Sequence, residues 1–223
     1  MSIGHLWGDQ HTKDMIQGAP CTAMPMEVLR CYDVPGVDVI WHHIYPEGMG
    51  SPLAGSMIPF MPRFASSAAA QIGIGLALTE SMSLYGESQT PSIIRYVFGA
   101  QAVRGINVFN INYISYGKNK IRPEFWPEKP GYESLTVVNA FLKRLSYLAK
   151  VGVTECCTAL YLPCMDIAGG DNADPFHTLG LALEKHNVYF DIIDDAFIRE
   201  AVIREEGEQR SLCMGLASYR HVF

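Results

Sequence analysis

The chain has 223 residues, of which 48% are hydrophobic and 18% charged, and its formal net charge is −6. This composition is typical of a packed globule and excludes a disordered chain. Lysine and arginine are scattered, and no apolar run approaches the roughly 20 residues of a membrane span, so neither nucleic acid nor a membrane is an expected partner. The six cysteines show no CxxC spacing, and no signal peptide opens the sequence, so we expect a cytoplasmic protein with free thiols.

The first half of the sequence predicts four repeated strand–helix units. Strands are expected at residues 2–7, 37–41, 72–79 and 106–111, and a turn at 33–36 precedes the second strand. Helices are expected within 13–30, over 63–71 and from Pro91 to Gly105. The strands recur at roughly 35 residues, the spacing of parallel strands joined by helical crossovers. The first half is therefore predicted to be an α/β unit with a parallel sheet.

The second half begins after a polar, proline-bearing stretch and predicts a further α/β unit with short connections. Helices are expected at 135–148, 175–186 and 196–205, and strands at 157–162, 188–193 and 218–223. Flavodoxin-like doubly wound domains have this alternation. We therefore divide the chain into a first domain at residues 1–116, a connector at 117–133 and a second domain at 134–223.

Glu80 is the candidate catalytic residue. It directly follows the apolar run IGIGLALT, which reads as a strand buried on both faces. Barrels of parallel strands keep their catalytic groups at the carboxyl ends of the strands. The alternative is an ordinary carboxylate at a strand end, paired with an arginine.

Aromatic and polar residues follow the ends of the first two predicted strands and would lie at the same edge as Glu80. Asp9, Trp41 and His42 are the candidates for binding a ligand there, with plain loop positions as the alternative. His42 and His43 form a pair, but no further ligand follows at a suitable spacing, so no metal site is predicted.

Four segments resemble the α-L-rhamnosidase family of glycoside hydrolases (family 106) and, more distantly, the β-galactosidases of family 42. These segments are FMPRFASSAAAQIG, ALTESMSLYG, QAVRGINVFNINYISY and NAFLKRLSYLAKVG. The resemblance implies the C-terminal half of a (β/α)8 TIM-type barrel followed by the start of a flavodoxin-like α/β domain. The loop after Glu80 departs from the family because it lacks a Gly-Trp pair, so the resemblance does not determine the sugar.

The resemblance also assigns roles to individual residues. It makes Glu80 one of two catalytic carboxylates and places Tyr85, Asn112 and Tyr113 at the mouth of the barrel. The other carboxylate of the family would lie upstream of Met1. No cofactor is expected, although the rhamnosidases imply a calcium ion whose ligands are not mapped onto this chain.

The expected function is therefore cleavage of a glycosidic bond, with α-L-rhamnosides as the first candidates and a carbohydrate as the partner. Such chemistry needs two carboxyl groups, and Glu80 would act as nucleophile or as general base. Because four strands do not close an eight-stranded barrel, we expect a homo-oligomer or a missing N-terminal barrel half. The alternatives are an inactive carbohydrate-binding or assembly module that lacks the second carboxylate, and a small α/β enzyme complete in itself.

Overall fold

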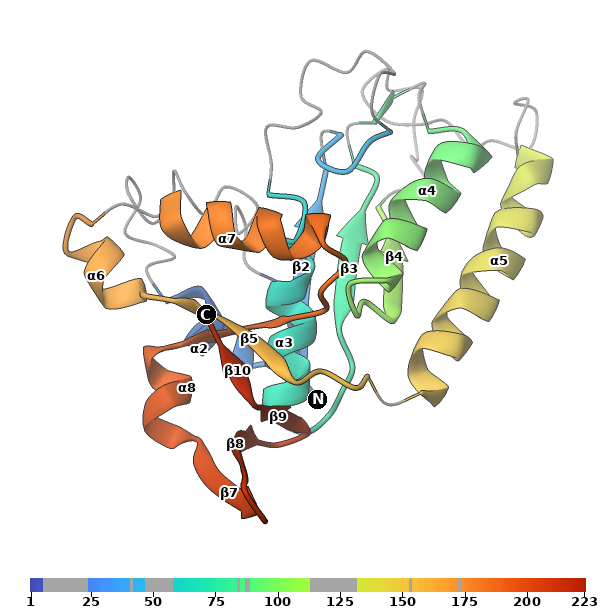
Figure 1. Cartoon of the computed structure of the whole chain (residues 1–223). Coiled ribbons are helices and arrows are strands. Elements are labelled where there is room, and N and C mark those ends of the chain that lie inside the picture. Colours follow the sequence, from blue (N-terminus) through green and yellow to red (C-terminus); the bar gives the residue numbers. More distant parts are fainter. Residues whose placement is uncertain are drawn as a thin grey trace.

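The computed structural model describes residues 1–5, 24–40, 42–46, 58–83, 85–86, 89–112, 132–152, 154–171 and 174–223. Within these residues the chain is a mixed α/β structure with two parallel sheets and one antiparallel sheet (Figure 1). This confirms the predicted fold class in its coarse form. The described strands form open sheets and not a closed barrel. No helix in the described part of the chain is long and apolar enough to cross a membrane.

The first sheet has four parallel strands in the order in which they occur along the chain. They are β1 (Ile3–His5), β2 (Val34–Val39), β3 (Leu78–Ser81) and β4 (Val108–Ile111). Because all four run in the same direction, their carboxyl ends meet at one edge of the sheet. The register places Asp38, Glu80 and Asn110 side by side across β2, β3 and β4.

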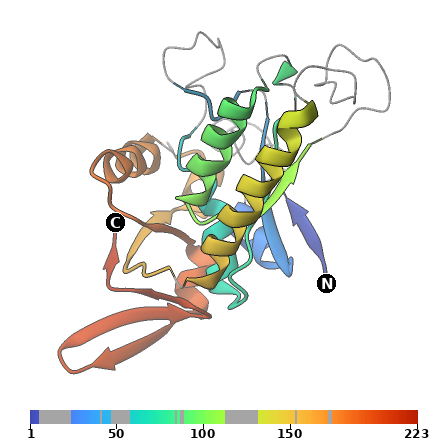
Figure 2. The same ribbon diagram turned by 90° about the vertical axis from the view of Figure 1, so that its right-hand side faces the viewer.

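Helices cover one face of this sheet (Figure 2). They are α2 (Pro25–Arg30), α3 (Arg63–Gln71), α4 (Pro91–Ala102) and α5 (Tyr132–Val151). The start of α4 is as predicted: Pro91 occupies its first turn, and the side chain of Thr90 accepts a hydrogen bond from the Ile93 amide. The Phe98 ring of α4 packs against Phe109 of β4 with centroids 5.3 Å apart, so this face of β4 points to the helices.

The strand that carries Glu80 is shorter than predicted. Residues 72–77 are not extended strand, and β3 begins only at Leu78 and runs on to Ser81. Gly73 and Gly75 have φ values of 80° and 67°, in the left-handed region that breaks a strand. The amides of Ile74 and Gly75 bind the Ala69 carbonyl at the end of α3 instead of a neighbouring strand. The first part of the apolar run IGIGLALT is therefore a turn that ends α3, and only its last two residues belong to β3.

The turn predicted at residues 33–36 is also wrong from Val34 onward, because Val34, Pro35 and Gly36 belong to β2. The Val34 amide donates to the Ser2 carbonyl beside β1 at 3.1 Å. Proline is tolerated at the next position because its nitrogen faces the β3 side, where pairing starts only at Gly36.

The second region contains a parallel sheet in the order β10-β5-β6 and an antiparallel sheet in the order β7-β8-β9. The parallel strands are β5 (Thr158–Leu162), β6 (Asp191–Asp194) and β10 (His221–Val222). The helices are α6 (Cys164–Ala168), α7 (Asp174–Lys185) and α8 (Asp195–Glu200). The antiparallel strands are β7 (Val202–Glu206), β8 (Gln209–Met214) and β9 (Ala217–Tyr219).

The antiparallel strands correct the helix predicted at 196–205, which ends at Glu200 as α8. The chain continues as β7 and β8, a hairpin that projects from the body of the molecule (Figure 2). Gly207 has a φ of 63°, which allows the tight turn between the two strands. Strand β7 has two β-branched residues followed by three charged ones, so its sequence lacks the alternation that distinguishes a strand from a helix.

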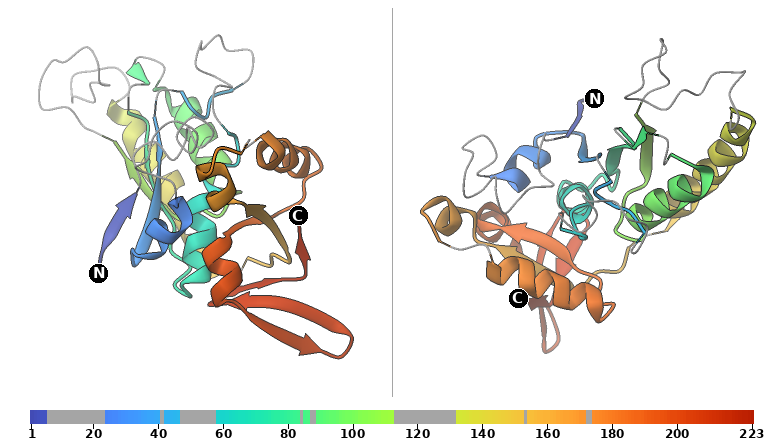
Figure 3. Two further views of the ribbon diagram at one scale, coloured as in Figure 1. Left: turned by 90° about the vertical axis from the view of Figure 1, so that its left-hand side faces the viewer. Right: turned by 90° about the horizontal axis from the view of Figure 1, so that it is seen from above.

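Helix α3 lies between the two parallel sheets and contacts both (Figure 3). One buried hydrophobic cluster contains Phe64 of α3, Val97 of α4 and Leu160 and Ile192 of the second sheet. Ser67 accepts a hydrogen bond from the Ile192 amide, and Gln71 donates one to the Ile192 carbonyl, both at 2.8 Å. These two side chains supply the partners that a further strand would give to β6. The boundaries of the two domains stay a prediction, but their described parts share this core.

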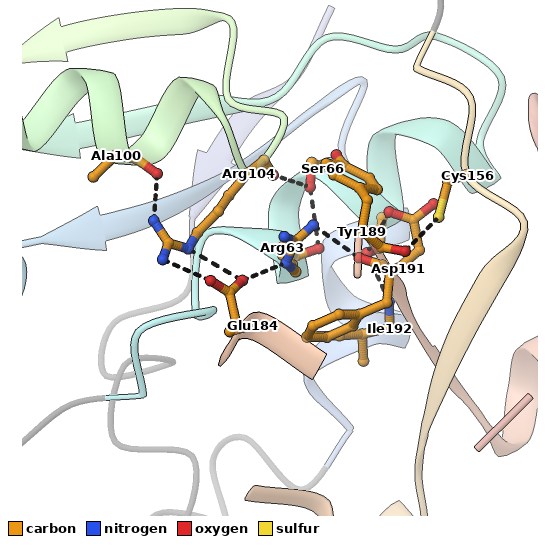
Figure 4. Close-up of polar contacts among 11 residues, drawn as sticks. Arg63, Ser66, Ala100, Arg104, Cys156, Glu184, Tyr189, Asp191 and Ile192 are labelled. Atoms are coloured by element: carbon orange, nitrogen blue, oxygen red, sulfur yellow. Dashed lines mark hydrogen bonds and ion pairs between the residues drawn. The ribbon is translucent and has the colours of Figure 1, made fainter. Parts of the chain in front are cut away.

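A partly buried polar network ties α3 and the turn after α4 to the second region (Figure 4). Glu184 of α7 accepts hydrogen bonds from Arg63 at 2.9 Å and from Arg104 at 2.7 Å. Arg63 also donates to the Phe190 carbonyl and stacks over the Tyr189 ring at 4.3 Å. Because each charge in this network has an opposite charge or a carbonyl as its partner, we interpret the network as structural.

The ion pair of Arg30 with Asp194 yields a first prediction. Arg30 on α2 donates to the Asp194 carboxylate at 3.0 and 3.3 Å, and Asp194 is fully buried. We expect Arg30→Ala to lower the free energy of unfolding by about 3–5 kcal/mol, because it leaves a buried charge without its partner. Arg199→Ala is the matched control: its pair with Glu27 is largely exposed, and its loss should cost at most about 1 kcal/mol. Urea unfolding of both variants measures the difference, and equal losses would contradict it.

Candidate functional site

The candidate site lies at the carboxyl edge of the first sheet, on the face that turns away from the helices. Successive residues of a strand point to opposite faces. Ser81 points to the helices, where its hydroxyl contacts the Gln101 side chain of α4. Its neighbour Glu80 therefore points to the other face, together with Asp38 and Asn110, which pair with it in register.

Two side chains from other strands hold the Glu80 carboxylate. The Nδ2 atom of Asn112, one residue beyond β4, donates a hydrogen bond to Oε1. The Nε2 atom of His5 on β1 lies 3.1 Å from Oε2 and makes a hydrogen bond when this nitrogen carries the proton. Glu80 keeps 28% of its side chain exposed. Two partners thus orient the carboxylate, which still reaches the surface. These partners are an asparagine and a histidine, and not the arginine expected for an ordinary carboxylate at a strand end.

His5 reaches Glu80 across an intervening strand because Gly36 has no side chain. His5 pairs with Gly36 of β2, and Gly36 pairs with Leu78 of β3. A Cβ atom on Gly36 would lie 3.2 Å from the His5 Cβ atom and 3.0 Å from the Leu78 Cδ2 atom. The glycine therefore leaves the path over β2 open for the imidazole.

Asp38 is a second carboxyl group beside Glu80, and the sequence analysis missed it. Only 3% of the residue is exposed, and its Oδ1 atom has no hydrogen-bond partner in the described part of the chain. The pKa of Asp38 is raised to about 6: burial raises it most, His5 lowers it, and the charge of Glu80 adds a smaller increase. The sequence did show an aspartate between two valines in a predicted strand. It did not show that Glu80 lies beside this aspartate, because that depends on the register of the two strands.

His42 and Tyr85 lie together in the loops that follow β2 and β3. Their rings are 4.7 Å apart, and His42 Nε2 is 3.3 Å from the Tyr85 carbonyl. Tyr85 is buried, its hydroxyl donates to the Ile44 carbonyl at 2.8 Å, and burial raises its pKa. These contacts join the two loops to each other. A role for His42 and Tyr85 in binding a ligand stays a prediction.

Three predicted site residues, Asp9, Trp41 and Tyr113, lie outside the described residues. The described residues do not form a set of ligands for the calcium ion that the resemblance implies. No group of three or more His, Cys, Asp or Glu side chains there is placed to hold a metal ion. We therefore derive no chemical step through a metal.

A cavity of about 300 Å³ lies at the opposite end of the strands. It is lined by Ala77 and Asn107, which precede β3 and β4, and by Tyr189 and Asp191 at the start of β6. In open α/β sheets with parallel strands, ligands bind beyond the carboxyl ends of the strands. We therefore place the candidate site at Glu80 and not in this cavity.

Comparisons with known proteins show a likeness in fold. No protein-family model matches the chain, and no curated protein matches it in sequence. Among solved structures, a rhamnosidase from Novosphingobium sp. PP1Y aligns with a TM-score of 0.63 and 16% sequence identity. The alignment covers 89% of this chain but only 19% of the rhamnosidase. At this identity the likeness shows that the chain shares the fold of that part of the rhamnosidase.

Replacing Gly36 tests how the site is packed. We expect Gly36→Ala to lower the free energy of unfolding by about 1–3 kcal/mol, because the new methyl group has to displace Leu78 and His5. Gly99→Ala in α4 is the control, because nothing lies within 4 Å of its added methyl group. That variant should be stabilised by about 0.5–1 kcal/mol, the usual gain of alanine over glycine in a helix. Urea unfolding measures both changes, and a stable Gly36→Ala protein would contradict the packing described.

The raised pKa of Asp38 predicts a dependence of stability on pH. A folded-state value of about 6, above the value of the unfolded chain, means that the folded protein holds the proton more tightly. The stability due to this proton is complete below about pH 4 and is lost as the pH rises through about 6. We therefore expect Asp38→Asn to unfold at higher urea at pH 7, with a gain of up to about 3 kcal/mol, and to show little gain at pH 4. An equal effect at both pH values would contradict the assignment.

Proposed function

We propose that this chain contributes to the active site of a glycoside hydrolase, with Glu80 as one of its two catalytic carboxylates. The observation that carries the proposal is the Glu80 carboxylate itself. Asn112 and His5 hold it at the carboxyl edge of a parallel sheet, and it remains partly exposed. The likeness in fold to part of a rhamnosidase supports the same class, and α-L-rhamnosides are the first substrates to test.

Hydrolysis of a glycosidic bond uses two carboxyl groups that flank the scissile bond. Glu80 would act as nucleophile or as general base, and both roles need a carboxylate with a fixed direction. The amide of Asn112 and the imidazole of His5 supply that direction by holding one oxygen each. We propose that the other carboxylate comes from residues outside this chain, as the resemblance to family 106 implies.

We further propose that the four-stranded sheet is half of a (β/α)8 barrel. Its strands follow one another in chain order, all are parallel, and helices cover one face, as in consecutive barrel units. A doubly wound sheet would instead reverse its strand order and carry helices on both faces. The missing half would come from another segment or another copy, and the second region would be the start of a flavodoxin-like domain.

The proposal is tested by measuring both sugar binding and hydrolysis. We expect the 223-residue chain to bind L-rhamnose, detected by chemical-shift changes in NMR titration, and Glu80→Ala to weaken that binding by about tenfold, because a charge-assisted hydrogen bond is lost. Glu208→Gln, an exposed position in the β7–β8 turn, is the control and should bind as the parent does.

Hydrolysis of an aryl α-L-rhamnoside distinguishes the two functional classes. A protein that joins this chain to an N-terminal barrel half should turn the substrate over, and Glu80→Gln should abolish the turnover. Binding without turnover in that protein would favour an inactive carbohydrate-binding module. No binding of L-rhamnose or methyl β-D-galactoside by the chain, together with no turnover, would contradict both functions.

A further inference from the structure

Asp38 and Glu80 occupy neighbouring positions on neighbouring parallel strands and point to the same face of the sheet. Adjacent strands lie about 4.8 Å apart, so the two side chains leave the sheet side by side. Glu80 has both oxygens engaged, by Asn112 and by His5. Asp38 differs, because its Oδ1 atom is buried and has no hydrogen-bond partner among the described residues.

A buried carboxylate oxygen without a donor is costly, and such groups in native proteins call for a specific explanation. The free energy is recovered when a ligand brings a donor to that oxygen. The surrounding groups on this face of β1, β3 and β4 are His5, Glu80 and Asn110. They are polar, and a ligand that carries several hydroxyl groups can bond to them together.

We propose that Asp38 is a second carboxyl group of the binding site and that its Oδ1 atom accepts a hydrogen bond from a hydroxyl group of the carbohydrate bound against Glu80. This inference rests on the proposed function and adds a contact that determines which hydroxyl pattern the site accepts. A site built around a buried acceptor discriminates strongly against an analogue that lacks the matching hydroxyl.

Asp38 is not assigned as the carboxylate that completes hydrolysis. The two catalytic carboxyl groups of a glycosidase flank the scissile bond. Asp38 and Glu80 leave the same face of the sheet at adjacent positions, so they approach a ligand from the same side. A contact to a hydroxyl group is the role that this geometry allows.

The contact depends on the protonation of Asp38. The titratable groups that face Asp38 in the described residues are His5 on β1 and Glu80 on β3. The carboxylate form accepts from a ligand hydroxyl more strongly than the protonated acid, since a charged acceptor makes the stronger hydrogen bond. Because the carboxyl group loses its proton near pH 6, sugar binding should strengthen as the pH rises through that value.

The test is an NMR titration of the 223-residue chain with L-rhamnose at pH 5 and at pH 7.5. At pH 7.5 we expect Asp38→Asn to weaken binding by about tenfold and to abolish the difference between the two pH values. Asp171→Asn, an exposed aspartate in the second region, is the matched control and should keep both the affinity and the pH difference. Because Asp38→Asn is expected to be the more stable protein at pH 7, weaker binding would not reflect unfolding.

A series of monodeoxy rhamnoses locates the contact. One deoxy sugar should bind the parent chain more weakly than L-rhamnose does. Asp38→Asn should bind that sugar and L-rhamnose about equally, because the substitution and the missing hydroxyl remove the same hydrogen bond. If Asp38→Asn binds L-rhamnose as tightly as the parent, or keeps the pH difference, the inference is wrong and the proposed function stands. If neither protein binds L-rhamnose or methyl β-D-galactoside, the proposed function fails and the inference fails with it.

Discussion

The structure depends on the way α3 completes the edge of the second parallel sheet. Strand β6 lies at the end of that sheet, where its backbone groups would lack a neighbouring strand. Ser67 and Gln71 of α3 bind both backbone groups of Ile192, so the helix takes the place of a strand. The same helix packs its apolar side against β2 of the first sheet. One element of nine residues thereby contacts both sheets.

The site at Glu80 is a consequence of register in the first sheet. Register brings an acid of β2 beside an acid of β3, and it brings a glycine of β2 under the imidazole of His5. On this face of the sheet each of these strands contributes one polar side chain: His5 from β1, Asp38 from β2 and Glu80 from β3. Together they orient one carboxylate and bury another, Asp38, whose pKa is raised. Burying Asp38 lowers stability at neutral pH, and groups that lower stability in this way are concentrated at functional sites.

Much of the fold could be predicted from the sequence because its long elements have strong local signals. Helix α3 has the predicted bounds, and Pro91 marks the start of α4 as predicted. The predictions were wrong at two segments whose composition fits more than one kind of secondary structure. The run before Leu78 is apolar but contains two glycines in left-handed conformations, and the segment after Glu200 is a hairpin and not helix.

The sequence by itself determined the α/β class, the alternation of strands and helices and the position of Glu80 near the end of a strand, because these depend on periods and on residues close in the chain. Only the tertiary structure decided which groups surround Glu80. His5, Asp38 and Asn112 come from three other places in the chain and meet through strand pairing. The valines on either side of Asp38 indicate the face to which it points, but the sequence of β2 alone does not show which residue of β3 lies beside it.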